Sequence, residues 1–238
     1  MEKGPFFRTA LVIGRDNVAD LHSKKVWVFG CGGVGGYVVE ALTRAGVGHI
    51  CAVDMDSVDI TNINRQCVAL HSTVGKPKTE VLKQRCLDIN PDIDFKAIQK
   101  MFSPETEGEF DFSDADYIVD AIDTVTCKLR LIEIAGAKGI PVISSMGTGN
   151  KTDPTQLRVA DIYSTEGDPL ARVMRRELKK RGIDSLKVVY SPQKPVEQTY
   201  VEEGSTRPVT ASVPWVPPVA GFIIAGEVVM DLCGLKNE

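Results

Sequence analysis

Two cations and several carboxylates occur in this sequence at positions where they could act on a phosphate group. Arg65 and Lys78 follow the second apolar run of the chain, and Asp123 ends the run 117–122. Cations stabilise the charge that builds on phosphate oxygens during phosphoryl or nucleotidyl transfer, and carboxylates are common ligands of Mg²⁺. We therefore predict Arg65, Lys78 and Asp123 as catalytic residues. Asp123 is also the predicted Mg²⁺ ligand, and Asp120 is the weaker metal candidate.

The element that must position these groups is a glycine-rich turn between a strand and a helix. The apolar run 26–29 leads into GCGGVG at 30–35, and a helical pattern follows. In such a turn one glycine makes the tight bend, one lets backbone N–H groups approach a phosphate, and one lets the helix pack on the strand. A second apolar run ends on Asp54, which is placed to accept hydrogen bonds from a ribose. This pattern predicts a nucleotide site that includes Gly30, Gly32, Gly33, Gly35 and Asp54.

A polar segment, TNINRQ at 61–66, extends the predicted site. Arg65 could instead form a surface salt bridge, and asparagines are also common turn-formers, but the motif context favours phosphate contact for Arg65. Asp123 could cap the following helix, although its place after an apolar strand favours a ligand role. The remaining candidate nucleotide-binding residues are Asp56, Thr61, Asn62, Asn64, Gln66 and Thr124.

In these motifs the chain resembles the adenylating superfamily that contains the ThiF, MoeB and ubiquitin-activating enzymes. The shared elements are the GxGGxG turn, D-x-D at 54–56, T-N-x-x-R-Q at 61–66, G-x-P-K at 75–78 and the aspartate at 123. The resemblance implies an α/β fold with a Rossmann-like, mostly parallel sheet and the nucleotide at its switch point. It also implies ATP and Mg²⁺ as cofactors. In this superfamily an arginine such as Arg8 reaches the nucleotide of a neighbouring subunit; a solvated surface arginine is the alternative.

The order of patterns divides the chain into an N-terminal helical arm (1–24), an adenylation core (25–150) and a substrate-side extension (151–238) of the same globular unit. In the extension we expect an antiparallel strand over 156–162, a mobile excursion over the active site at 191–213, and a final helix. The apolar stripe predicted for that helix, which suits core or dimer packing, consists of Val219, Phe222, Ile223, Gly226, Val229 and Met230.

A strongly basic helix is predicted to begin at Asp168 in the extension. A charge run of this kind is most often a solvated helix face. In a chain of net charge −4 it is also a plausible footprint for a phosphate backbone. The candidate nucleic-acid contacts are Arg172, Arg175, Arg176, Lys179 and Lys180.

The second half of the chain is similar to the tRNA threonylcarbamoyladenosine dehydratase branch of the superfamily. The similarity rests on the segments 146–150, 153–156, 159–161 and 168–171, followed by the basic helix. It implies ATP-dependent activation of the threonylcarbamoyl carboxylate on a tRNA adenosine, followed by cyclisation with loss of water. It further implies a homodimer and a link to a cysteine desulfurase with its sulfur acceptor. A monovalent cation near 147 is compatible with the sequence.

Composition and cysteine spacing narrow the remaining alternatives. The six cysteines fall singly without a C-x-x-C pair, so no zinc is expected. Cys51 and Cys86 are predicted core thiols, and Cys127 is predicted to be structural.

No signal sequence or membrane span is recognisable, so a cytoplasmic location is expected. One alternative function is activation of a ubiquitin-like sulfur-carrier protein. Another is a nucleotide-sensing module or dinucleotide oxidoreductase, against which the cations and Asp123 argue.

Overall fold

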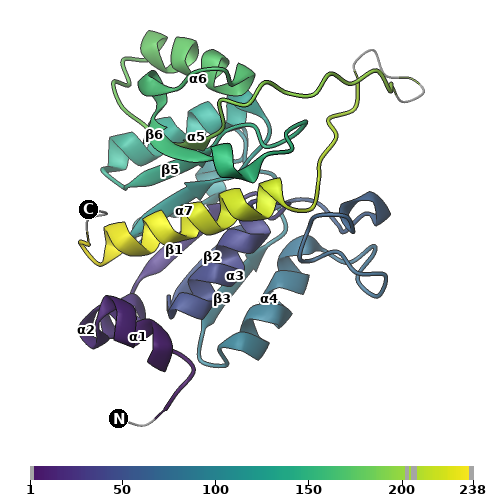
Figure 1. Ribbon diagram of the computed structural model, residues 1–238. Helices are drawn as coiled ribbons and strands as arrows, with labels where there is room; N and C mark the ends of the chain where they lie inside the picture. Colours follow the sequence, from purple (N-terminus) through teal and green to yellow (C-terminus); the bar gives the residue numbers. More distant parts are fainter. Residues whose placement is uncertain (1–2, 202–203, 205–207, 236–238) are drawn as a thin grey trace.

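The computed structural model describes residues 3–201, 204 and 208–235, and its centre is a seven-stranded sheet with the order β3-β2-β1-β4-β5-β7-β6 (Figure 1). All neighbouring strands are parallel except β6, which runs antiparallel to β7. The predicted α/β architecture and its antiparallel extension are therefore confirmed. The strands are β1 Lys25–Phe29, β2 His49–Val53, β3 Asp94–Ile98, β4 Tyr117–Asp120, β5 Val142–Ser145, β6 Arg158–Asp161 and β7 Lys187–Tyr190.

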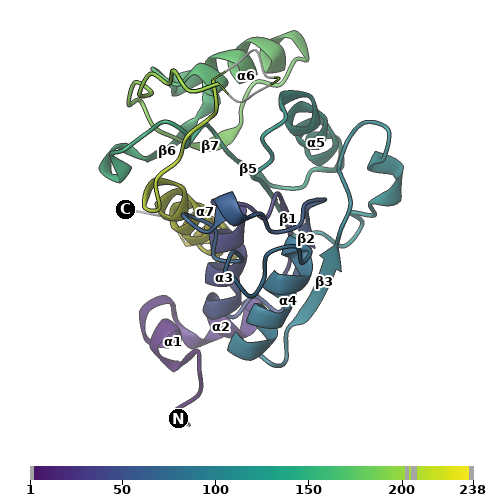
Figure 2. The same cartoon turned by 90° about the vertical axis from the view of Figure 1, so that its right-hand side faces the viewer.

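Helices cover both faces of the sheet, because alternate residues of the central strand face opposite sides. Val26 and Val28 pack with α3, α4 and α7, which lie side by side (Figures 1 and 2), whereas Trp27 and Phe29 pack with α5 and an aromatic cluster. The α-helices are α1 Phe7–Ile13, α2 Arg15–Leu21, α3 Gly35–Ala45, α4 Lys78–Ile89, α5 Val125–Lys138, α6 Pro169–Lys180 and α7 Val216–Leu232. Short 3₁₀ turns occur at Ile60–Asn62, Glu107–Glu109, Pro154–Gln156 and Ile162–Ser164.

The N-terminal arm consists of two helices, α1 and α2, which are separated at Gly14, where φ is +95°. Phe6 and His22 of this arm pack at Gly46, the residue that ends α3. The arm therefore lies at the C-terminal end of α3, whereas the glycine turn lies at the N-terminal end of the same helix. Arg8 is exposed on α1, which belongs to this arm.

Only part of the apolar stripe predicted for the last helix packs in the core: Val229 is buried, and Val219 and Ile223 are partly buried against it. Dimer packing of the rest stays a prediction. The face of α7 that is buried contains Val216, Ala220, Ile224 and Val228, whereas Phe222 is 50% exposed. Only two residues of α7 carry a charge, so its sequence has no polar face from which the buried side could be predicted. Among the described residues no helix has both the length and the apolar character that a membrane span requires.

Candidate active site

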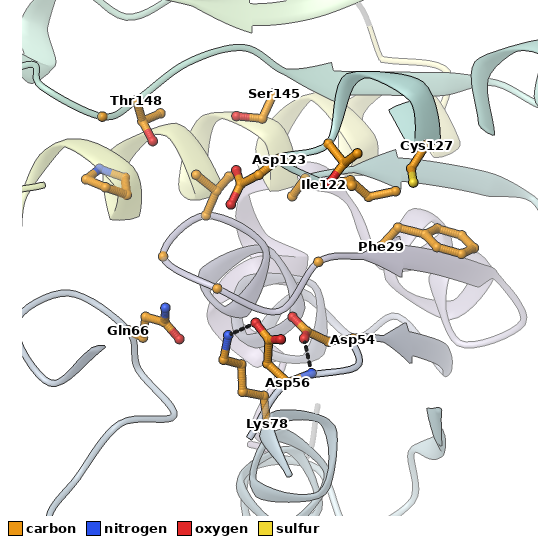
Figure 3. Close-up of a pocket in the computed structure, with 18 of the residues that line it drawn as sticks. Phe29, Asp54, Asp56, Gln66, Lys78, Ile122, Asp123, Cys127, Ser145 and Thr148 are labelled. Carbon is orange, nitrogen blue, oxygen red and sulfur yellow. Dashed lines mark hydrogen bonds and ion pairs between the residues drawn. The ribbon is translucent and has the colours of Figure 1, made fainter. Parts of the chain in front are cut away.

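A cavity of about 600 Å³ opens at the carboxyl ends of β1, β2, β4 and β5 (Figure 3). In a doubly wound sheet this is the edge at which ligands bind. In Figure 3 Asp54, Asp56 and Lys78 lie on one side of the cavity, and Asp123, Ser145 and Thr148 lie opposite. The predicted residues that line it are Gly30, Gly32, Gly33, Asp54, Asp56, Arg65, Gln66, Lys78, Asp123 and Thr124.

Two of the glycines are required because no side chain fits at their positions. Gly30 has a φ of +87°, and a Cβ there would lie 2.4 Å from the Ala121 carbonyl oxygen. A Cβ on Gly35 would lie 1.7 Å from the carbonyl oxygen of Gly30, so this glycine allows α3 to pack against the turn. Gly35 itself does not line the cavity, whereas Gly32 and Gly33 do.

Asp54 is held between the glycine turn and the loop after β2. Its carboxylate accepts hydrogen bonds from the Cys31 N–H at 2.6 Å and from the Asp56 N–H at 2.8 Å. Burial raises the pKa of the Asp54 carboxyl, while the nearby Lys78 ammonium and these two backbone donors act in the opposite direction. The carboxylate is thus oriented by the backbone.

The two predicted cations reach the cavity in different ways. Lys78 begins α4, is only 5% exposed, and places its Nζ 2.7 Å from an Asp56 carboxylate oxygen. The Arg65 guanidinium donates to the Thr61 carbonyl at 3.1 Å and to the Asn64 side-chain oxygen at 2.9 Å. Arg65 forms no ion pair with any residue that the structure describes, which removes the surface salt bridge as an alternative.

Three polar residues of the segment 61–66 lie outside the cavity lining. Asn62 accepts a hydrogen bond from the Asp59 N–H in a capping box, as a turn-forming asparagine does, and its role as a nucleotide ligand stays a prediction. Thr61 donates its N–H and hydroxyl to Asp59. Asn64 donates to the Ser212 carbonyl at 2.9 Å. These side chains therefore shape the loop that carries Arg65.

The two aspartates near the end of β4 have opposite environments. β4 ends at Asp120, three residues earlier than predicted; this carboxylate is fully buried, 2.9 Å from the Lys128 ammonium and 2.6 Å from the Ser144 hydroxyl. Its partners exclude the predicted weaker metal role. Asp123 is exposed at the cavity and takes part in no hydrogen bond or ion pair among the described residues. Thr124 occupies the N-cap position of α5 without a side-chain cap bond.

A second part of the cavity lining was not predicted from the sequence. β5 neighbours β4, so the residues after its end face the same crevice; this topological signal could have identified the turn after β5. No local signal in the sequence identifies the other unpredicted lining residues, because they come from segments that are distant in the sequence. The unpredicted lining includes Lys100, Phe102, Ser145, Gly147, Thr148, Gly149, Leu170 and Pro217.

The segment predicted as an excursion over the site has no regular secondary structure where it is described. Asn150 joins it at two points: its N–H donates to the Ala211 carbonyl at 2.8 Å, and its carbonyl accepts from the Val196 N–H at 2.6 Å. Thr210 and Ser212 line the cavity. The predicted range 191–213 includes residues 202–203 and 205–207, which lie outside the described part.

The cysteines and other potential metal ligands are dispersed. Cys51 and Cys86 are buried in the core, as predicted, and burial raises the pKa of each thiol to about 11. Cys127 lines the cavity but is 3% exposed, and burial raises its pKa. The residues that the structure describes contain no group of three or more His, Cys, Asp or Glu side chains that could hold a metal ion.

The predicted basic helix is α6, and its cations differ in their partners. Arg175 donates to the Thr165 carbonyl at 2.7 Å and to the Thr165 hydroxyl. Lys180, Arg181 and Arg176 all pair with Glu177, and these contacts lower the Glu177 pKa to about 2. The exposed cations of α6 without an ion pair among the described residues are Arg172 and Lys179.

Comparison with known proteins agrees with this geometry. The sequence model of the ThiF family matches residues 7–237. A tRNA threonylcarbamoyladenosine dehydratase of Bacillus subtilis (strain 168) is 43% identical over 238 residues, which covers 95% of this chain and 94% of that protein.

Solved structures give the same result. The structure of E. coli tRNA N6-threonylcarbamoyladenosine dehydratase, TcdA, in complex with AMP has a TM-score of 0.88 at 30% identity and covers 97% of this chain and 94% of that chain. Its complex with ATP has a TM-score of 0.87 with the same identity and the same coverage. The chain therefore belongs to the ThiF family, and within it to the group of tRNA threonylcarbamoyladenosine dehydratases.

Proposed function

We propose that this chain uses ATP to activate the carboxylate of threonylcarbamoyladenosine in tRNA, which then cyclises with loss of water. The observation that carries the proposal is one cavity that joins the glycine turn, Arg65, Lys78 and Asp123. The near-complete match to dehydratases supports the choice of substrate within the family. The enzyme is thus an ATP-dependent, adenylate-forming dehydratase.

In the first step the substrate carboxylate attacks the α-phosphate of ATP, and pyrophosphate leaves. The glycine turn lets backbone N–H groups approach the phosphates. Asp54, oriented by two backbone bonds, accepts from the ribose. Arg65 and Lys78 stabilise the charge that develops on the phosphate oxygens. Much of the acceleration comes from holding the two reactants together in this geometry.

The residues at the cavity fit a bound Mg²⁺. Magnesium usually takes one or two protein carboxylates and completes its shell with water and substrate phosphates, and Asp123 offers an exposed carboxylate without a partner among the described residues. We propose that Asp123 holds this ion. When bound, Mg²⁺ supplies Lewis-acid polarisation and orientation of the phosphates.

The second step needs no nucleophile from the protein. The activated carboxyl group is attacked by an atom of its own threonylcarbamoyl side chain, and AMP leaves. Cys127, the cysteine that lines the cavity, is buried with a raised thiol pKa, so its thiol stays protonated and is a poor nucleophile.

We propose that α6 contacts the tRNA backbone through its exposed cations. Reversing Arg172 and Lys179 to glutamate is expected to weaken tRNA binding and to lower the slope of log K against log salt by about 0.7–0.9 for each lost phosphate contact. Both residues are exposed and unpaired among the described residues, so the fold is not expected to change. Binding is measured by filter retention at several salt concentrations.

The matched control for α6 reverses Lys83 and Lys96 to glutamate. These lysines lie on α4 and on the edge strand β3, at the opposite end of the sheet from β6 and α6. The control changes the net charge equally and should retain most of the binding. Equal losses of tRNA binding in both variants would show that net charge alone causes the effect. The basic side of α6 would then be a solvated helix face and not a tRNA-binding surface.

We further propose a homodimer in the cytoplasm, with Arg8 acting on the partner's nucleotide. The half-exposed side of α7 around Phe222 supports an interface, and the position of Arg8 at the far end of α3 supports action between subunits. The cysteine desulfurase and its sulfur acceptor are proposed partners on family resemblance alone. A monovalent cation near Gly147 stays a prediction from the sequence.

The experiment that tests the function supplies ATP with tRNA that does or does not carry threonylcarbamoyladenosine. ATP consumption is measured, and the nucleosides are analysed by mass spectrometry. A product lighter by one water, formed only from the modified tRNA, is the expected result. ATP binding without that product, together with adenylate formation on a sulfur-carrier protein, would overturn the proposal in favour of a protein acceptor.

A further inference from the structure

Two lysines are enclosed in the protein behind the walls of the cavity. Lys128 is 0% exposed and Lys151 is 2% exposed. Each ammonium is paired with an equally buried carboxylate, Lys128 with Asp120 at 2.9 Å and Lys151 with Asp168 at 2.5 Å. Enclosed ion pairs contribute little net stability, because desolvation offsets their attraction. Stability alone therefore does not account for two such pairs beside one cavity, and the segments that each lysine contacts point to a further role.

Lys151 joins three segments that are distant in the sequence. It directly follows the turn 147–150, part of which lines the cavity. Its Nζ donates to the Asp168 carboxylate at the start of α6 and to the Ser191 carbonyl at 2.8 Å, where the chain leaves β7. One ammonium thus ties together the turn, the basic helix and the beginning of the excursion.

Asp168 transmits this contact to the cavity wall. Its other carboxylate oxygen accepts from the Ala171 N–H at 2.9 Å and so caps α6, whose first turn places Leu170 at the cavity. A Cβ added to Gly147 would lie 3.7 Å from the same carboxylate, so the turn packs directly on it. We call residues 147–149 with Leu170 the Gly147 wall.

Lys128 has the corresponding place behind a different wall. Its Nζ donates to the Ile122 carbonyl at 3.0 Å, and its partner Asp120 accepts from the Ile122 N–H at 3.1 Å. These contacts fix residues 121–124, all of which line the cavity and which include Asp123. We call this segment the Asp123 wall. The two buried pairs share no residue and no hydrogen-bond partner.

We propose that Lys151 is a positioning residue for the tRNA-bound substrate, acting through the Gly147 wall, while Lys128 positions the nucleotide through the Asp123 wall. The inference rests on the proposed function. The groups of a chain that we assign to its own ATP come from the glycine turn, from residues 54–78 and from the Asp123 wall. The Gly147 wall, in contrast, continues into α6, which carries the candidate tRNA contacts.

The test compares Lys151→Met with Lys128→Met, two equivalent removals of a buried ammonium. Steady-state kinetics are measured with ATP and with tRNA carrying threonylcarbamoyladenosine, each varied at saturation of the other. Lys151→Met is expected to raise the KM for tRNA about tenfold and to leave the KM for ATP within twofold. Lys128→Met is expected to raise the KM for ATP by a similar factor and to leave the KM for tRNA within twofold. Parallel shifts in both constants would overturn the proposal.

A milder pair of variants covers the case in which a methionine variant does not fold. Asp168→Asn keeps one acceptor oxygen, which can still cap α6 because asparagine is a good N-cap residue, but its amide nitrogen cannot accept from the Lys151 ammonium. Asp120→Asn is its counterpart. Asp168→Asn is expected to raise mainly the KM for tRNA and Asp120→Asn mainly the KM for ATP, each by less than the corresponding methionine variant. Unchanged constants in folded protein would count against positioning by either pair.

Hydrogen exchange of backbone amides provides a readout that does not depend on the substrate. Lys151→Met, or Asp168→Asn, should accelerate exchange at 147–150 and leave 121–124 unchanged, and the Lys128 and Asp120 variants should do the reverse. Uniform acceleration would mean general destabilisation and would refute the division between walls. Absence of any tRNA product with the unchanged enzyme would instead refute the proposed function, and the exchange pattern would still test the inference.

Discussion

Replacing Arg65 by alanine is expected to lower the rate of adenylate formation by roughly 10² to 10³-fold, the usual effect of removing one group that stabilises transition-state charge. The folded state should be little affected, because among the described residues the guanidinium donates only to the Thr61 carbonyl and to the side chain of Asn64, within its own loop. Formation of the adenylate is measured by release of pyrophosphate in the presence of modified tRNA, and stability by thermal unfolding.

Two further variants define the role of Arg65. Arg65→Lys keeps the charge without the planar fork, so partial recovery is expected if charge dominates and none if bidentate geometry does. Arg85→Ala removes a guanidinium that pairs with Glu40 on α3 and does not line the cavity; its turnover should be near normal. Near-normal turnover of Arg65→Ala would refute the assignment.

Replacing Lys78 by methionine is expected to impair catalysis for two reasons. The variant loses a cation at the phosphates, with a rate loss of roughly 10²-fold or more. It also loses the charge that partly offsets the effect of burial on Asp54, so the already raised pKa of Asp54 rises further. Because an acid with a higher pKa is less ionised at a given pH, the acid limb of the pH–rate profile should move to higher pH. Both effects are measured as kcat/KM for ATP across pH.

Lys100→Met is the matched control for Lys78→Met. Lys100 also lines the cavity, but it is exposed and already paired with Glu109. Solvent screens such a charge, so its removal should change kcat/KM only a few-fold and should not move the pH profile. A shift of the profile in both variants would show that the net charge of the cavity, and not the charge of Lys78 in particular, controls the ionisation of Asp54.

The parts of the site that the sequence predicts well are those whose chemistry is local. The glycine turn is recognisable because a positive φ at Gly30 and the absence of space at Gly35 permit no other residue. The antiparallel strand and the basic helix follow from residue patterns of one segment. The capping bond of Asn62 could not be predicted, because an asparagine that caps a turn and one that binds a ligand look alike in the sequence.

The sequence by itself determined the family, the parallel sheet, the nucleotide turn and the identity of the candidate cations. Tertiary structure decided which of two aspartates three residues apart is paired, since only Asp120 meets a lysine, whereas Asp123 is left exposed at the cavity. It also decided the buried face of α7 and brought Lys151, Asp168 and Ser191 together. The physical reason is common to these cases: burial and ion pairing depend on contacts between distant segments, and no periodicity or motif within one segment encodes them.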